Sequence, residues 1–171
     1  MIRVVGAALV IFGTSAWGLL GVLRLRRRET SIGALARSIG LLRAEICTLT
    51  TPLSEAAARL ARECEPPAAK FYENLLEDLP RLGDATFPEL WRGAAERTPE
   101  LLLNPDEASA LRELAKSLGK YNIEEQRAAL LYAERQFEAF YARAASIRER
   151  DTKLRAMLGV ASGVFAVLLL L

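Results

Sequence analysis

The side chains that could do chemistry in this sequence are two cysteines and a large set of carboxylates, and the chain has no histidine. A Ser-His-Asp triad, a histidine zinc site and a histidine-ligated haem are therefore excluded. The sequence also lacks a GxxxxGK[ST] phosphate loop, a GxSxG elbow and a CxxC pair. We therefore expect no catalytic residue, no cofactor and no metal, and a protein that is not an enzyme.

The remaining candidates fit structural roles better than reactive ones. Cys47 and Cys64 lie on apolar faces of expected helices, so we interpret them as core packing and not as a redox or metal pair. The carboxylates of Glu124 and Glu125 fall on an exposed helix face, where solvation or pairing with arginine at helical spacing is the expected role.

Two uncharged blocks, Val4 to Leu23 and Ala156 to Leu171, enclose every charged residue except Arg3. A helix over the first block would be about 30 Å long, which matches the hydrocarbon core of a bilayer. The second block is shorter, and the aliphatic stem of Arg155 can extend it by snorkelling. The sequence predicts a membrane-spanning helix in each block.

Each block also has an alternative interpretation. The first could be a cleaved signal peptide, but its basic start is a single arginine and "RLRRRE" follows without a small-x-small cleavage site. The second could be a buried core helix, but no polar residue follows Ser162. Both comparisons favour uncleaved spans.

Basic residues near the inner ends of the spans predict the orientation. Arg3 alone lies outside, and the central segment is flanked by Arg24, Arg26, Arg27, Arg28, Arg148, Arg150, Lys153 and Arg155. By the positive-inside rule, the central segment is cytoplasmic. The predicted organisation is a span in residues 1–23, a cytoplasmic helical domain in 24–155 and a second span in 156–171. A disulfide is not expected in that reducing compartment.

The central segment shows helical periodicity throughout and no strand pattern. Two heptad seams run along its ends and continue the helices of the neighbouring spans. The first seam comprises Ile32, Leu35, Ile39, Leu42, Ile46, Leu49 and Leu53. The second comprises Ile123, Gln126, Leu130, Ala133, Phe137, Phe140, Ala144, Ile147 and Leu154. These two long helices can pair antiparallel or pack on the shorter helices between them, and both arrangements are expected at different heights.

Proline and capping residues divide the region between the seams. Thr51 is expected to leave the first helix and to cap the next, with Pro52 at its first position. "EPP" at 65–67 marks another corner and "PRLG" at 80–83 closes a third helix. Thr86 to Glu89 and Asn104 to Glu107 have the spacing of helix N-termini. The predicted fold is all-α, a bundle of about six helices whose two long outer helices run into the N- and C-terminal transmembrane helices.

Two further features concern the membrane. Gly159 and Gly163 form a GxxxG motif, and Gly6 and Gly13 give the first span small residues, so close helix packing is expected there. A contact within one chain and a contact between subunits are equally open. The "RLRRR" cluster is better explained by attraction to the anionic lipid bilayer than by nucleic acid, because the net charge is only +2.

The layout resembles the stage III sporulation protein AB family over essentially the whole chain. The resemblance rests on "LLRAEI…TPLSEAAARLA", the "LW" before Arg92, "LAKSLGKYNIEEQRAAL" and "KLRAMLGVASGVFAVLLLL". It implies a component of the membrane machinery between mother cell and forespore. The family's soluble domain is similar to the cytoplasmic domain of type II secretion and type IV pilus platform proteins.

That resemblance implies partners as well. By analogy the chain would be a platform of a sporulation secretion channel in the mother-cell membrane around the forespore, working with the sporulation ATPase of the same machinery and with other channel subunits. Secretion platforms usually carry two such domains and three spans, so a homodimer is one way to supply the second domain. Asn122 stands where family members often have Asp, which weakens a salt bridge there.

We expect this scaffold to dock its partners through charged side chains near the first and last turns of the bundle. The candidate docking residues are Arg43, Glu45, Glu55, Arg59, Glu124, Glu125 and Arg127. The alternative function is a coiled-coil membrane signalling or adaptor protein without a transport role. A receptor would need a sensing domain outside the membrane, and a membrane enzyme would need ionisable residues inside its spans, which contain only Thr14, Ser15 and Ser162.

The orientation can be tested with sealed right-side-out vesicles. Protease added outside should leave residues 30–150 intact, because the positive-inside rule places them in the lumen. Mass spectrometry of the digest measures this, and vesicles opened with detergent are the control. Digestion of that segment in sealed vesicles would reverse the predicted topology.

Overall fold

The computed structural model describes residues 2–118 and 122–170, with side chains for 21–118 and 122–154. The chain divides into two compact units, one made of residues 1–29 with 143–171 and the other of residues 30–142. The described residues form six α-helices and two 3-10 helices, without a strand. In chain order these are α1 (Ile2–Cys47), α2 (Leu53–Glu63), α3 (Ala68–Asp78), η1 (Leu79–Arg81), α4 (Phe87–Glu96), η2 (Pro99–Leu101), α5 (Pro105–Leu118) and α6 (Ile123–Leu170). The all-α class and the six helices are confirmed.

Within the unit of residues 30–142, α1 and α6 run antiparallel and approach closely at two glycines. A Cβ atom at Gly33 would lie 3.0 Å from Cε2 of Tyr141, and one at Gly40 would lie 2.8 Å from Oε1 of Glu134. Both glycines are one heptad apart, as are the two residues of α6 that face them. The register of the two helices therefore depends on glycine, which has no side chain, at positions 33 and 40.

The centres of both predicted seams are buried in one apolar core. Ile32, Leu35, Ile39 and Leu42 of α1 and Leu130 and Phe137 of α6 are fully buried. The ends of the seams were predicted wrongly. Leu49, Ile123, Ile147 and Leu154 are exposed, whereas Leu53 packs against the core. Leu49 lies beyond the end of α1 and Ile123 is the first residue of α6.

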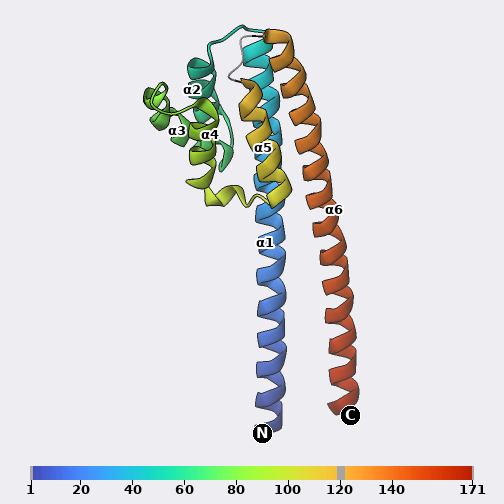
Figure 1. Cartoon of the computed structure of the whole chain (residues 1–171). Helices are drawn as coiled ribbons and strands as arrows, with labels where there is room; N and C mark the ends of the chain where they lie inside the picture. The colour runs from blue at the N-terminus through green and yellow to red at the C-terminus, as the bar shows by residue number, and fades with distance from the viewer. Residues whose placement is uncertain (1, 119–121, 171) are drawn as a thin grey trace. The chain divides into compact units, whose positions relative to one another are not determined.

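Helices α2, α3, α4 and α5 gather beside the C-terminal part of α1 in the same unit (Figure 1). Edge-to-face aromatic contacts join α3 to α4, with the ring of Trp91 centred 4.8 Å from Phe71 and 6.3 Å from Tyr72. Such pairs contribute about 0.5–1.5 kcal/mol beyond the area that they bury. These rings make α3 and α4 a single packed layer.

Two of the helix starts predicted from capping signals are confirmed. The Thr86 N–H donates to Oε2 of Glu89 at 2.8 Å and completes a capping box at α4. The Asn104 N–H donates to Oε2 of Glu107 at 2.7 Å at the start of α5. The corner at 65–67 separates α2 from α3, with a cis peptide bond between Pro66 and Pro67.

The cap predicted for α2 is wrong by one residue. The carbonyl of Pro52 accepts the first helical hydrogen bond, from Ala56 N–H at 2.9 Å, so Pro52 is the N-cap and Leu53 the first helical residue. The Thr51 hydroxyl instead donates to Oε2 of Glu45 at 2.8 Å. The Thr51 hydroxyl, which was expected to cap α2, is therefore hydrogen-bonded to Glu45 of the preceding helix.

The predicted spans lie almost wholly outside the residues whose side chains are described. Within 21–118 and 122–154, no helix has a stretch long and apolar enough to cross a bilayer. The two spans and the domain limits 1–23, 24–155 and 156–171 stay predictions.

Replacing Phe137 tests the contribution of the α1–α6 packing. Phe137→Ala should lower the free energy of unfolding by about 3–5 kcal/mol, since its fully buried ring leaves a cavity. Tyr132→Ala is the matched control, because this aromatic residue of α6 is 68% exposed and its loss should cost less than about 0.5 kcal/mol. Chemical denaturation followed by circular dichroism measures both, and equal effects would contradict the packing.

Candidate functional site

The C-terminal end of α1 is shaped by a carboxylate that holds the following turn. Thr50 adopts a left-handed backbone conformation with φ 53°. Glu45 then binds Thr51 twice, since its backbone carbonyl accepts from Thr51 N–H at 2.9 Å and its carboxylate accepts from the Thr51 hydroxyl. The side chain of Glu45 is only 13% exposed. Glu45 is thus mainly a structural residue of this corner.

Three of the candidate docking residues are linked by consecutive ion pairs across the corner. Arg59 of α2 places Nη1 3.4 Å from Oε1 of Glu45 and Nη2 3.3 Å from Oε1 of Glu55. Arg59 is partly exposed and Glu55 is 56% exposed. Glu55, at the outer end of this ion-pair series, faces solvent. Exposed ion pairs contribute little to stability, so its carboxylate can exchange partners.

Arg43 is paired with a residue that the sequence did not single out. Its Nε lies 2.7 Å from Oε2 of Glu134 on α6, and this hydrogen bond, with the charge of the carboxylate, raises the pKa of Arg43. Glu134 could have been found only from the antiparallel register, which places it opposite Gly40. Arg43 therefore links α1 to α6 and is not joined to Glu45, Glu55 or Arg59.

The first turn of α6 meets the end of α1. Nη2 of Arg127 donates to the carbonyl of Cys47 at 3.3 Å, which satisfies a C-terminal carbonyl of α1. Oδ1 of Asn122 accepts from Glu124 N–H at 3.0 Å and so caps α6. Glu124 and Glu125 are exposed, as predicted, and their charges favour the positive end of the helix dipole.

The structure thus gathers the predicted docking residues at one end of the unit of residues 30–142. A hollow of about 260 Å³ lies between α1, α2, α5 and α6 at this end, lined by Ile46, Thr50, Thr51, Leu53, Leu118, Ile123 and Gln126. The residues that line the hollow are uncharged. We call the candidate docking residues of this part of the unit the corner surface: Arg43, Glu45, Glu55, Arg59, Glu124, Glu125 and Arg127. It carries four carboxylates and three guanidinium groups.

The predicted packing glycines Gly6, Gly13, Gly159 and Gly163 lie outside the residues whose surroundings the structure describes. In the unit that contains residues 1–29 and 143–171, Nε of Arg148 lies 2.9 Å from Oε2 of Glu29. One of the basic residues near the predicted spans is therefore paired within the protein.

Both cysteines are free thiols packed against the apolar core, as predicted. Cys64 lies directly after α2, and burial, together with the nearby Glu63 charge, raises the pKa of its thiol to about 11. Since the thiolate is the nucleophile and the metal ligand, Cys64 is poorly suited to either task near neutral pH. Among the residues with described side chains, no three acidic or cysteine residues cluster as a metal site would require.

These observations define the class: an all-α helical bundle with charged residues at one corner of the unit of residues 30–142. A family model described as Stage III sporulation protein AB matches residues 3–171, so the chain belongs to this family of sporulation proteins. The resemblance found in the sequence is confirmed.

Two individual relatives agree with this assignment. Stage III sporulation protein AB of Bacillus subtilis (strain 168) is 23% identical over 172 residues, covering 100% of both proteins. A solved structure of Stage III sporulation protein AB matches with a TM-score of 0.65 and 22% identity, over 72% of this chain and 98% of that chain. This second likeness supports the fold.

The raised pKa of Cys64 predicts slow alkylation. In a Cys47→Ser variant, iodoacetamide at pH 8 should modify the folded chain at least about tenfold more slowly than the chain in urea, whose thiol has an ordinary pKa of about 8.5. The rate in the folded chain should rise with pH up to about 11, the pKa of the buried thiol. Mass spectrometry follows the reaction, and equal rates at pH 8 would show that Cys64 is not shielded.

Proposed function

We propose that this chain is a membrane-anchored platform of the channel between mother cell and forespore, and that it docks the cytoplasmic sporulation ATPase of that machinery. The observation that carries the proposal is the corner surface, which combines charged side chains of α1, α2 and the first turns of α6. Membership of the Stage III sporulation protein AB family supports the sporulation role.

The internal ion pairs of the corner surface support a docking role. Glu45 and Arg59 are held in fixed positions by Thr51 and by each other, so a partner would meet a preorganised surface. Glu55, Glu124 and Glu125 keep exposed carboxylates that can pair with basic residues. A docking partner with an exposed basic patch fits this pattern best.

The two uncharged blocks of the sequence support the membrane anchor, with the bundle in the cytoplasm. Two spans would hold the corner surface at the mother-cell membrane around the forespore. The spans themselves, through Gly6, Gly13, Gly159 and Gly163, would contact other channel subunits or a second copy of the chain.

Charge reversal of exposed residues tests the proposal with little effect on folding. A Glu55→Lys and Glu124→Lys double variant should retain at least about tenfold less ATPase in co-purification from detergent, since like charges then oppose the partner's basic residues. Glu45→Lys is less informative alone, because burying a lysine beside Arg59 would also destabilise the corner.

Glu73→Lys is the matched control, because Glu73 is an exposed carboxylate on α3 outside the corner surface. It should retain the ATPase at the level of the unchanged protein. The amount of ATPase in each complex is measured by quantitative mass spectrometry. Undiminished retention by a folded double variant would exclude the corner surface as the docking site.

A further inference from the structure

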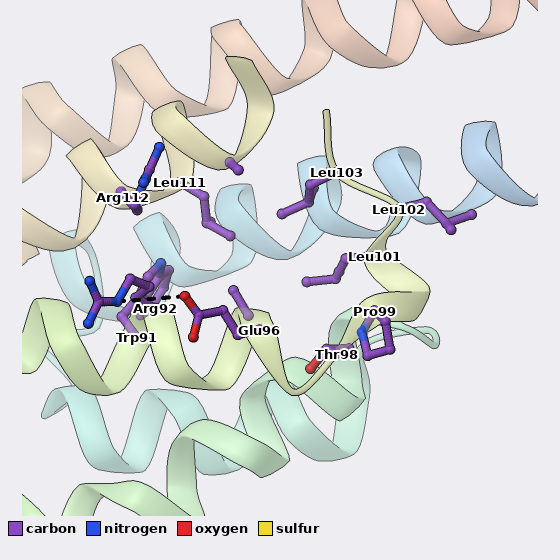
Figure 2. Close-up of a pocket in the computed structure, with 12 residues that line it drawn as sticks. Trp91, Arg92, Glu96, Thr98, Pro99, Leu101, Leu102, Leu103, Leu111 and Arg112 are labelled. Carbon is purple, nitrogen blue, oxygen red and sulfur yellow. Dashed lines mark ion pairs between the residues drawn. The ribbon is translucent and has the colours of Figure 1, made fainter. Parts of the chain in front are cut away.

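A second recess lies away from the corner surface, between α4, η2 and α5. It has a volume of about 360 Å³, in the range of protein sites that take up small ligands or single side chains. Figure 2 shows it between α4 and α5, with Leu101 and Leu103 beside it. Its walls are largely apolar and comprise Trp91, Ala95, Leu101, Leu103, Ala108 and Leu111. We call it the α4–α5 recess.

Hydrogen bonds hold the segment that borders this recess in place. The Ser31 hydroxyl of α1 donates to the carbonyl of Leu101 at 2.7 Å. The Thr98 hydroxyl donates to the carbonyl of Ala94 at 2.8 Å and accepts from Nδ2 of Asn74 at 2.8 Å. Because these polar groups are buried, the recess is preformed and would not have to be ordered on binding.

Two residues that line the recess have unusual features. Trp91 is 1% exposed, and its Nε1 has no hydrogen-bond partner among the described residues. Leu102 adopts a left-handed backbone conformation with φ 52° and is 44% exposed. A bulky residue in that conformation is strained, and such strain tends to occur at ligand-binding positions.

The charges around the recess are predominantly positive. Arg92 and Arg112 line it together with a single carboxylate, Glu96, which pairs loosely with Arg92 at 3.8 Å. Arg112 has no partner in the part of the chain that the structure describes. An apolar pocket with an unpaired guanidinium is complementary to a large apolar side chain next to a carboxylate.

We propose that the α4–α5 recess docks a segment of a partner protein that carries a leucine-sized side chain beside an acidic residue. The apolar side chain fills the recess, whose wall includes Trp91, and the carboxylate pairs with Arg112. This docking site is separate from the corner surface and does not depend on it.

The probes are three capped hexapeptides, Gly-Ser-Leu-Glu-Ser-Gly and its versions with alanine for leucine or lysine for glutamate. They are added to the full chain in lipid nanodiscs, since detergent could itself fill an apolar recess. A Trp17→Phe background leaves Trp91 as the single indole, whose N–H resonance is followed by NMR. The Leu-Glu peptide should shift this resonance in a saturable manner.

The variants separate the apolar and ionic contributions. The alanine peptide should bind at least about tenfold more weakly, and the lysine peptide about threefold more weakly, as expected for an exposed ion pair. Arg112→Glu should reverse the preference between the glutamate and lysine peptides. Ala108→Phe should abolish binding by filling the recess, whereas Ser109→Phe, an exposed neighbour on α5, should leave it unchanged.

Three results would overturn the proposal. The first is no shift of the Trp91 resonance with any peptide, and the second is equal affinity for all three peptides. The third is a shift that depends on protein concentration without peptide, which would assign the recess to a second copy of the chain. None of them affects ATPase retention by the corner surface, so the two sites can fail separately.

Discussion

The unit of residues 30–142 depends on the close approach of α1 and α6. Gly33 and Gly40 present no side chain where Tyr141 and Glu134 cross, and this fixes the antiparallel register of the two helices. Once the register is set, Phe137 enters the core and Glu134 meets Arg43. A shift by one helical turn would break both contacts at once. The shorter helices then pack on a frame whose geometry is already determined.

Polar contacts at the ends of this frame determine which residues are free to act. Glu45 faces Thr51 and Arg59, so it shapes the corner and has little surface to offer. Glu55, Glu124 and Glu125 lie at the outside of the same corner and are exposed. Charged residues that look alike in the sequence thus differ in the structure: some stabilise the corner through internal contacts, and others are exposed to solvent. The α4–α5 recess shows the same difference, because Ser31 and Thr98 hold the bordering segment while Arg112 is exposed and unpaired among the described residues.

The sequence predicted the helices well because their signals are local. Heptad spacing identified the buried residues at the centres of α1 and α6. Spacing alone also predicted the capping box at Thr86 and the helix start at Asn104. Errors occurred where a group outside the local pattern competes for a hydrogen bond. The Glu45 carboxylate accepts from the Thr51 hydroxyl, and Pro52 is the N-cap of α2. The ion pair of Arg43 with Glu134 and the α4–α5 recess were missed because each brings together residues from different helices.

The bond from Ser31 to the carbonyl of Leu101 and the packing of Phe137 join early and late parts of the polypeptide. On the ribosome, the apolar face of α1 emerges long before the residues that complete its core have been made. Helices α2 to α5 can cover part of this face. The surface of α1 around Gly33 and Gly40, which contacts α6 in the folded protein, remains uncovered until α6 is synthesised. The core of the unit of residues 30–142 can therefore close only after α6 has been synthesised, because Leu130 and Phe137 are buried in it.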